Sequence, residues 1–135
     1  MMAKLELVEG IGNKYAKDLR NAGVRSTGDL LKKGATPKSR EELAKASGIS
    51  KTLVLEWVNH VDLFRIKGVG EEYSDLLEEA GVDTVVELAQ RNVANLYETI
   101  LNTNNRKNLV RQLPSKKMVT NWVAQAKKLP RKIQY

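Results

Sequence analysis

A glycine turn near the start of the chain, Gly10-Ile11-Gly12, leads into a segment that begins like a helix. Its two glycines have no Cβ and allow backbone angles and close approaches that other residues oppose. The first N–H groups of a helix have no intrahelical acceptor and lie at the positive end of the helix dipole, so such a turn can bind an anion. Asn13, Lys14 and Lys17 follow the turn. This spacing predicts a phosphate site made of backbone amides and two lysines.

The same turn recurs 58 residues later as Gly68-Val69-Gly70. The residues around the two turns also match, pairing Tyr15 with Tyr73, Leu19 with Leu77, and Ala22-Gly23-Val24 with Ala80-Gly81-Val82. The flanking charges are opposite, because Glu71 and Glu72 follow the second turn. Carboxylates repel a phosphate, so we expect the second turn to be mainly structural, or a weaker anion site served by Arg65 and Lys67.

Each half also contains a weaker copy of the turn. The first is Gly48-Ile49-Ser50, followed by Lys51, and the second is Leu113-Pro114-Ser115, followed by Lys116 and Lys117. The helix dipole disfavours cations at the start of a helix, so the two lysines after Ser115 indicate a nearby anion. The alternative is that the C-terminal basic residues form a solvated face of the protein or neutralise the acidic 71–87 surface within the fold.

The elements that must position these turns are all predicted to be helices. Apolar and polar residues do not alternate over any strand-length window, whereas helix start and stop signals are frequent. A compact all-α fold of about nine short helices is therefore predicted. The expected helices cover residues 13–23 and 26–33, a segment that starts at Pro37, and residues 50–63, 71–80, 84–90, 93–102, 105–112 and 116–128.

The repeat divides the chain into two similar parts. Residues 1–65 form the first expected repeat, residues 66–130 the second, and residues 131–135 a loose tail. The later helices align at an offset of 65 residues, which pairs Trp57 with Trp122, so the second repeat holds about seven extra residues. We expect the repeats to pack as one globular unit with pseudo-twofold symmetry, and the tryptophans to anchor its core.

The composition excludes several classes of protein. The 135 residues include no Cys and one His, His60, which rules out disulfides, thiol catalysis and cysteine-ligated zinc. The longest apolar runs are three residues, so no membrane-spanning segment is predicted. No spacing indicates a catalytic triad, a P-loop or a paired acid and base. We therefore expect a cytoplasmic protein that is not an enzyme and has no metal or cofactor.

The net charge of +7 is distributed unevenly. Residues 66–98 carry −6, whereas residues 99–135 carry nine basic residues and no acidic one. A strongly basic surface favours association with a polyanion.

The repeated pattern Leu5-x-x-Val8-x-Gly10-Ile11-Gly12-x-x-x-Ala16-x-x-Leu19 resembles the helix-hairpin-helix motif. Over roughly residues 3–129 the chain resembles the domain-of-unknown-function 4332 family of small bacterial proteins. The residues that carry this second resemblance include Gly10-Ile11-Gly12, Ala22-Gly23-Val24, the run Asp62-Leu63-Phe64-Arg65-Ile66-Lys67-Gly68, Gly81-Val82-Asp83-Thr84 and Trp122. The resemblance implies tandem helix-hairpin-helix units that bind nucleic acid without sequence specificity, with hairpin amides gripping phosphates.

These observations predict a non-enzymatic protein that binds nucleic acid, DNA rather than RNA, through phosphates. The candidate contact residues are Gly10, Ile11, Gly12, Asn13, Lys14, Lys17, Gly48, Ser50, Lys51, Arg65, Lys67, Gly68, Gly70, Lys116 and Lys117. A protein-interaction adaptor built on the same helices is the alternative, and an enzyme acting on nucleic acid is a third hypothesis. The strandedness of the nucleic acid and the oligomeric state stay open.

Overall fold

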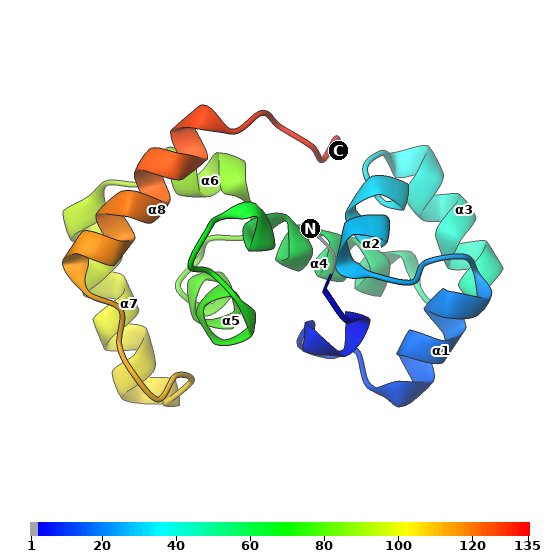
Figure 1. Ribbon diagram of the computed structural model, residues 1–135, viewed down its shortest axis with the longest axis horizontal. Helices are drawn as coiled ribbons and strands as arrows, with labels where there is room; N and C mark the ends of the chain where they lie inside the picture. Colours follow the sequence, from blue (N-terminus) through cyan, green and yellow to red (C-terminus); the bar gives the residue numbers. More distant parts are fainter. Residues whose placement is uncertain (1–2) are drawn as a thin grey trace. The chain divides into compact units, whose positions relative to one another are not determined.

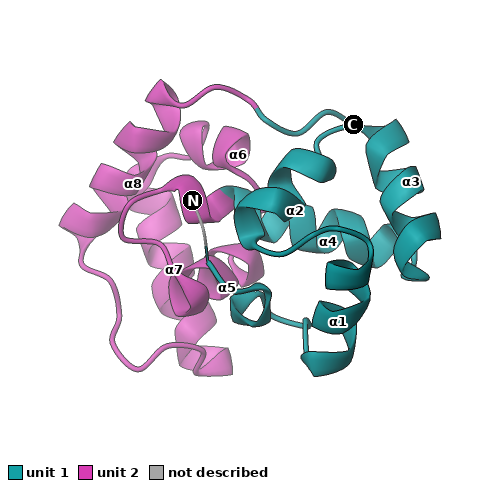
Figure 2. Cartoon of the chain, turned by 45° about the vertical axis from the view of Figure 1, so that its right-hand side comes forward, with its two compact units in different colours: residues 1–62, 132–135 teal, residues 63–131 magenta. Residues whose placement is uncertain are grey.

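In the computed structural model, which describes residues 3–135, the described chain forms eight α-helices, two short 3-10 helices and no strand (Figure 1). The all-α prediction is confirmed. The chain divides into two compact units, residues 1–62 with 132–135 as unit 1 and residues 63–131 as unit 2 (Figure 2). This division falls close to the expected boundary between residues 65 and 66.

Unit 1 holds the first glycine turn. Its elements are η1 (Leu5–Leu7), α1 (Asn13–Asn21), α2 (Thr27–Lys33), α3 (Pro37–Ser47) and α4 (Lys51–Asp62). Helix α4 packs against α2 and α3, and α1 packs against η1 and α3. Trp57 of α4 is 1% exposed and forms part of the core that holds the turn.

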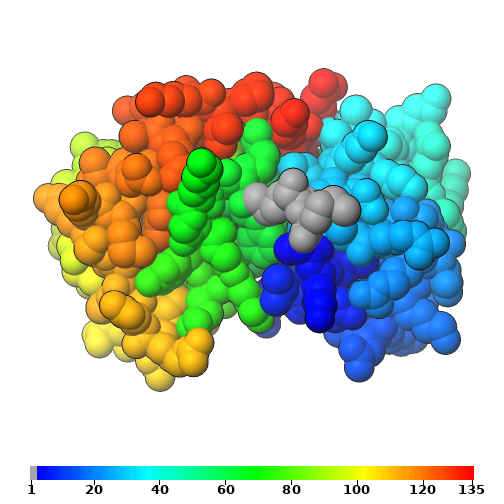
Figure 3. Space-filling model, viewed as in Figure 1, coloured from blue at the N-terminus to red at the C-terminus, as the bar shows by residue number. Residues whose placement is uncertain are grey.

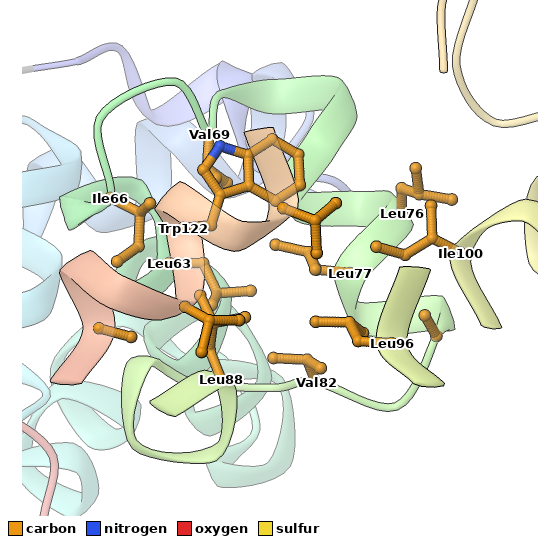
Figure 4. Close-up of a cluster of buried hydrophobic side chains, with 14 of the residues drawn as sticks. Leu63, Ile66, Val69, Leu76, Leu77, Val82, Leu88, Leu96, Ile100 and Trp122 are labelled. Atoms are coloured by element: carbon orange, nitrogen blue, oxygen red, sulfur yellow. The ribbon is translucent and has the colours of Figure 1, made fainter. Parts of the chain in front are cut away.

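Unit 2 repeats this plan around the second glycine turn. Its elements are η2 (Leu63–Arg65), α5 (Glu71–Glu79), α6 (Val85–Ala89), α7 (Val93–Lys107) and α8 (Lys116–Lys128). Helix α8 packs against α6 and α7, and α5 packs against α7. The apolar side chains of these helices form one buried cluster, in which Trp122 lies beside Val69 of the turn (Figure 4).

Five helices begin at a side chain that caps their first amides. The capping oxygens belong to Ser26, Thr36, Ser50, Asn92 and Ser115, and each accepts a backbone N–H at 3.0 to 3.2 Å. Such caps satisfy one of the N–H groups that lack an intrahelical acceptor. The two helices that follow the glycine turns, α1 and α5, instead begin at Gly12 and Gly70, which have no side chain to offer.

One helix boundary in unit 2 differs from the prediction. The sequence predicts separate helices at 93–102 and 105–112, whereas α7 runs unbroken from Val93 to Lys107 and residues 108–115 are not helical. The asparagine run suggested a break, but Ile100 and Thr103 are buried on one face and keep the helix continuous. It ends at Asn108, which adopts the left-handed conformation with φ of 52°.

The end of the chain is docked rather than loose. Ile133 is 2% exposed, and the Gln134 N–H donates to the Ala35 carbonyl at 2.7 Å. The buried Arg40 guanidinium donates to the carbonyls of Gly34 and Gln134, both at 2.8 Å. Residues 132–135 therefore belong to unit 1, in contrast to the expected loose tail at 131–135.

Candidate functional site

The first glycine turn is shaped by Gly10. This residue has φ of +92°, and a Cβ added to it would lie 3.2 Å from Nε1 of Trp57. The next residue, Ile11, donates its N–H to the Val8 carbonyl at 3.0 Å and buries its side chain. Gly10 is therefore needed for the backbone angle and for close packing under the indole.

Gly12 has a different environment. Its φ of −89° is open to any residue, and a Cβ added there would meet no atom within 4 Å. Across residues 3–135, the backbone N–H groups of Gly12, Asn13 and Lys14 have no acceptor, and the three residues are exposed. Unlike the five capped helices, α1 thus presents unused amides to solvent at its positive end.

Two lysines stand beside these amides. The Lys14 side chain is 86% exposed and lies 3.4 Å from the Asp18 carboxylate, an exposed pair that contributes little to stability. Lys17 is exposed and forms no ion pair with any described residue. The structure thus brings together the predicted Gly12, Asn13, Lys14 and Lys17, and their arrangement can hold an anion by amide and ammonium groups.

The second turn repeats the first in local detail. Gly68 has φ of +96°, and a Cβ there would lie 3.3 Å from Nε1 of Trp122. Val69 donates its N–H to the Ile66 carbonyl at 3.1 Å, as Ile11 does to Val8 in unit 1. The tyrosine that follows each turn packs on the tryptophan, with ring centroids 5.1 Å apart in unit 1 and 5.2 Å apart in unit 2.

The surroundings of the second turn are nevertheless different. The Glu72 carboxylate accepts the backbone N–H and the guanidinium of Arg111, both at 3.2 Å, and the Tyr73 hydroxyl donates to the Gln112 carbonyl at 3.0 Å. The 108–115 loop therefore attaches to the start of α5 and borders an open cavity of about 590 Å³ beside Gly70. The charged side chains at the start of α5 are thus Glu71, Glu72 and Arg111, where the start of α1 has lysines.

Arg65 and Lys67 lie on another side of the second turn. Arg65 donates to the Pro130 carbonyl at 2.9 Å. The Lys67 N–H donates to Oε1 of Gln125 at 2.9 Å, and Nε2 of Gln125 donates to the Lys67 carbonyl at 3.1 Å. The two bonds with Gln125 join the turn to α8. Sequence reasoning missed them, because nothing in the local pattern pairs residue 67 with residue 125.

At each of the two weaker turns, a serine side chain caps the helix that follows. Gly48 ends α3 in the left-handed conformation with φ of 74°, and Ser50 then caps α4 through the Leu53 N–H. Ser115 caps α8 through the Met118 N–H. Lys51 and the lysine pair 116–117 therefore stand at helix starts whose amides are partly used, unlike the open start of α1.

Alanine at Gly10 and at Gly12 should have opposite consequences for stability. Gly10→Ala forces a Cβ into the left-handed region and against Trp57, which should lower the free energy of unfolding by about 1–2 kcal/mol. Gly12→Ala meets open space, and its weaker capping is offset by lower entropy of the unfolded chain, so the change should stay within about 0.5 kcal/mol. Urea denaturation of both variants checks this, and equal losses would contradict it.

The contact between Glu72 and Arg111 should make unit 2 sensitive to acid. The Arg111 hydrogen bonds lower the pKa of Glu72, so this carboxylate stabilises the fold above the usual glutamate pKa of about 4.3 and loses that effect as pH falls through its lowered value. Glu72→Gln should therefore be less stable than the wild type at neutral pH, with a gap that closes in acid. Unfolding curves from about pH 7 to pH 3 test this. Glu98→Gln on the exposed side of α7 is the control, and a gap independent of pH would contradict the expectation.

Residues 3–135 lack a membrane-spanning helix and a cluster of metal-binding side chains. No helix there has both the length and the apolar character needed to cross a membrane. No group of three or more His, Cys, Asp or Glu side chains there could hold a metal ion.

The molecule is thus an all-α protein in which two glycine turns of matching backbone are followed by side chains of opposite charge, lysines in unit 1 and glutamates in unit 2. It belongs to the family described as Domain of unknown function (DUF4332), whose model matches residues 9–129. No curated protein and no solved structure matches the chain.

Proposed function

We propose that the protein binds nucleic acid, preferentially DNA, through its phosphate backbone and without catalysing a reaction. The observation that carries this proposal is the open start of α1, where the exposed N–H groups of Gly12, Asn13 and Lys14 have no acceptor among the described residues. A phosphate oxygen accepting from such amides gains charge-assisted hydrogen bonds and the favourable end of the helix dipole.

The packing around this turn supports its assignment as a helix-hairpin-helix. Leu5, Val8, Ile11, Ala16 and Leu19, the pattern's apolar or small positions, are at most 4% exposed. The pattern therefore describes the core under the turn, while the glycine cap and the lysines face outward. Such an arrangement contacts phosphates and not base edges, so we expect little sequence preference.

The proposal is tested by titrating fluorescently labelled duplex DNA with the full chain and measuring anisotropy at several salt concentrations. Affinity should fall steeply with salt, with a slope of log K against log salt of about −0.9 for each phosphate contacted. Lys14→Glu with Lys17→Glu should make this slope shallower by about 2 and weaken binding at least about tenfold. A glutamate at position 14 lies in the first turn of α1 and suits the helix dipole, and both positions are exposed, so this variant should remain folded.

Lys38→Glu with Lys45→Glu on α3 is the matched control. Both residues are exposed and lie on a helix outside the turn, and the change in net charge is the same. Equal weakening by the two variants would show that only net charge matters. A flat titration of the wild type with both duplex and single strands at low salt would remove the proposal.

The acidic side of unit 2 favours a second candidate, a protein-interaction adaptor. Burial, followed by the nearby Glu87 and Glu78 carboxylates, raises the pKa of Asp83. A cationic partner protein would relieve this repulsion. A partner that is captured equally well by the wild type and by the Lys14→Glu, Lys17→Glu variant would favour the adaptor.

A further inference from the structure

The exposed face of α8 carries no acidic side chain. Its exposed residues are Lys116, Lys117, Thr120, Asn121, Ala124, Lys127 and Lys128. Figure 3 shows this helix at the surface, in orange to orange-red. The face is thus basic at both ends and small or polar in the middle.

The four lysines of this face are not used inside unit 2. None forms an ion pair within residues 3–135, whereas Lys107 pairs with Glu79 at 2.6 Å and Arg111 pairs with Glu72 at 3.2 Å in the same unit. Two of them, Lys116 and Lys117, stand in the first turn of α8, where the helix dipole disfavours cations. Helix stability therefore does not explain their presence.

Gln125 holds the backbone of a further basic residue, Lys67, against α8. It bonds the backbone N–H and carbonyl of Lys67 at 2.9 and 3.1 Å, and its Nε2 also donates to the Asn121 side chain at 2.7 Å. The exposed Lys67 side chain thus starts from a backbone held against the helix between Lys117 and Lys128. At 1.5 Å per residue those two lysines are separated by about 16 Å along the axis, roughly the rise of five phosphates on one strand.

The corresponding helix of unit 1 has no such face. At the offset of 65 residues that pairs Trp57 with Trp122, Lys127 corresponds to Asp62 of unit 1, and Asp62 is 2% exposed. Helix α4 contains a single lysine, Lys51. The basic face therefore does not follow from the shared fold but is particular to unit 2, the unit whose glycine turn is flanked by carboxylates.

We propose that α8 and Lys67 form a second surface for the phosphate backbone of a nucleic acid, so that unit 2 binds through side-chain cations and not through the amides of its glycine turn. This inference rests on the proposed function. A phosphate backbone fits better than an acidic protein, because lysine is depleted and aromatic residues are enriched in protein interfaces, and this face exposes no aromatic side chain.

The α8 variant carries Lys117→Gln and Lys128→Gln together, and the control variant carries Lys38→Gln and Lys45→Gln together. Both are compared with the wild type in the same salt-dependent DNA titration. All four positions are exposed and each variant removes two charges. Loss of two phosphate contacts at α8 should make the salt slope shallower by about 2 and weaken binding at least about tenfold near 0.1 M salt, while the control should change the slope by less than about 0.5. Gln is a good helix former, so circular dichroism should show unchanged helix content.

The outcomes separate this inference from the proposed function. If the α8 variant behaves like its control while the Lys14→Glu, Lys17→Glu variant binds weakly, the α8 surface is wrong and the α1 site stands. If only the α8 variant weakens binding, the α8 surface stands and the α1 site is wrong. Absence of wild-type binding at low salt overturns both. Polyglutamate that competes as well as DNA, or self-association abolished by the α8 variant, overturns the assignment of this face to nucleic acid.

Discussion

Replacing Trp122 by alanine is expected to destabilise unit 2 by about 3–5 kcal/mol, the usual cost of deleting a large aromatic side chain from a core. The indole is 1% exposed and lies beneath the second glycine turn, where a Cβ on Gly68 would be 3.3 Å from its nitrogen. It also packs on Tyr73, with ring centroids 5.2 Å apart. Its loss removes the support of the turn and of α5 together.

Hydrogen exchange measured by mass spectrometry locates this effect, because a chain of two units need not unfold in one step. Amides of residues 63–131 should lose protection in Trp122→Ala, and Trp57→Ala should do the same to residues 3–62. Trp122→Phe, which keeps a ring in the site, is the control and should lose less. A loss below about 1 kcal/mol for the alanine variant would show that the ring is not an anchor.

Removing residues 132–135 is expected to lower the stability of unit 1 by about 3 kcal/mol. Burial of Ile133 contributes about 2 kcal/mol, and the bonds between Gln134 and its partners contribute the rest. Arg40 is 6% exposed, and this burial lowers the pKa of its guanidinium. Without Gln134 one of its two backbone acceptors is lost.

Two milder variants separate the contributions to this loss of stability. Ile133→Ala removes the apolar part and keeps the backbone bonds, while deletion of Tyr135 alone removes the 2.8 Å hydrogen bond to Asn59. Each should cost less than the full truncation when the free energy of unfolding is measured with urea. Unchanged stability of the truncated chain would mean that the segment is not part of the folded unit.

The helices could be predicted from the sequence mainly because their starts carry local signals. Ser26, Thr36 and Ser115 are capping residues in the sequence and cap helices in the structure. The expected helix at 105–112 was wrong because α7 ends at Asn108 in the left-handed conformation, and the Asn104 side chain accepts the N–H groups of Leu109 and Val110. Docking of Ile133 was not predicted either, because it depends on tertiary contacts with residues far away in the sequence.

Only part of the candidate site could likewise be predicted from the sequence. The open start of α1 could be predicted, because a glycine cap and following lysines are neighbours in sequence. Attachment of the 108–115 loop to Glu72, and of Gln125 to Lys67, could not, because these contacts join residues far apart in the chain. The insertion of about seven residues in the second half of the sequence was a signal that the second glycine turn has different neighbours from the first.

Each glycine turn lies against a tryptophan from a distant helix, as Gly10 does against Trp57. The free amides of α1 are therefore held in place only while unit 1 is intact. A polyanion that binds them more tightly than it binds the unfolded chain raises the melting temperature, and well above its Kd the rise follows the logarithm of its concentration. A thermal shift assay with increasing amounts of short duplexes is thus a simple way to compare candidate guests.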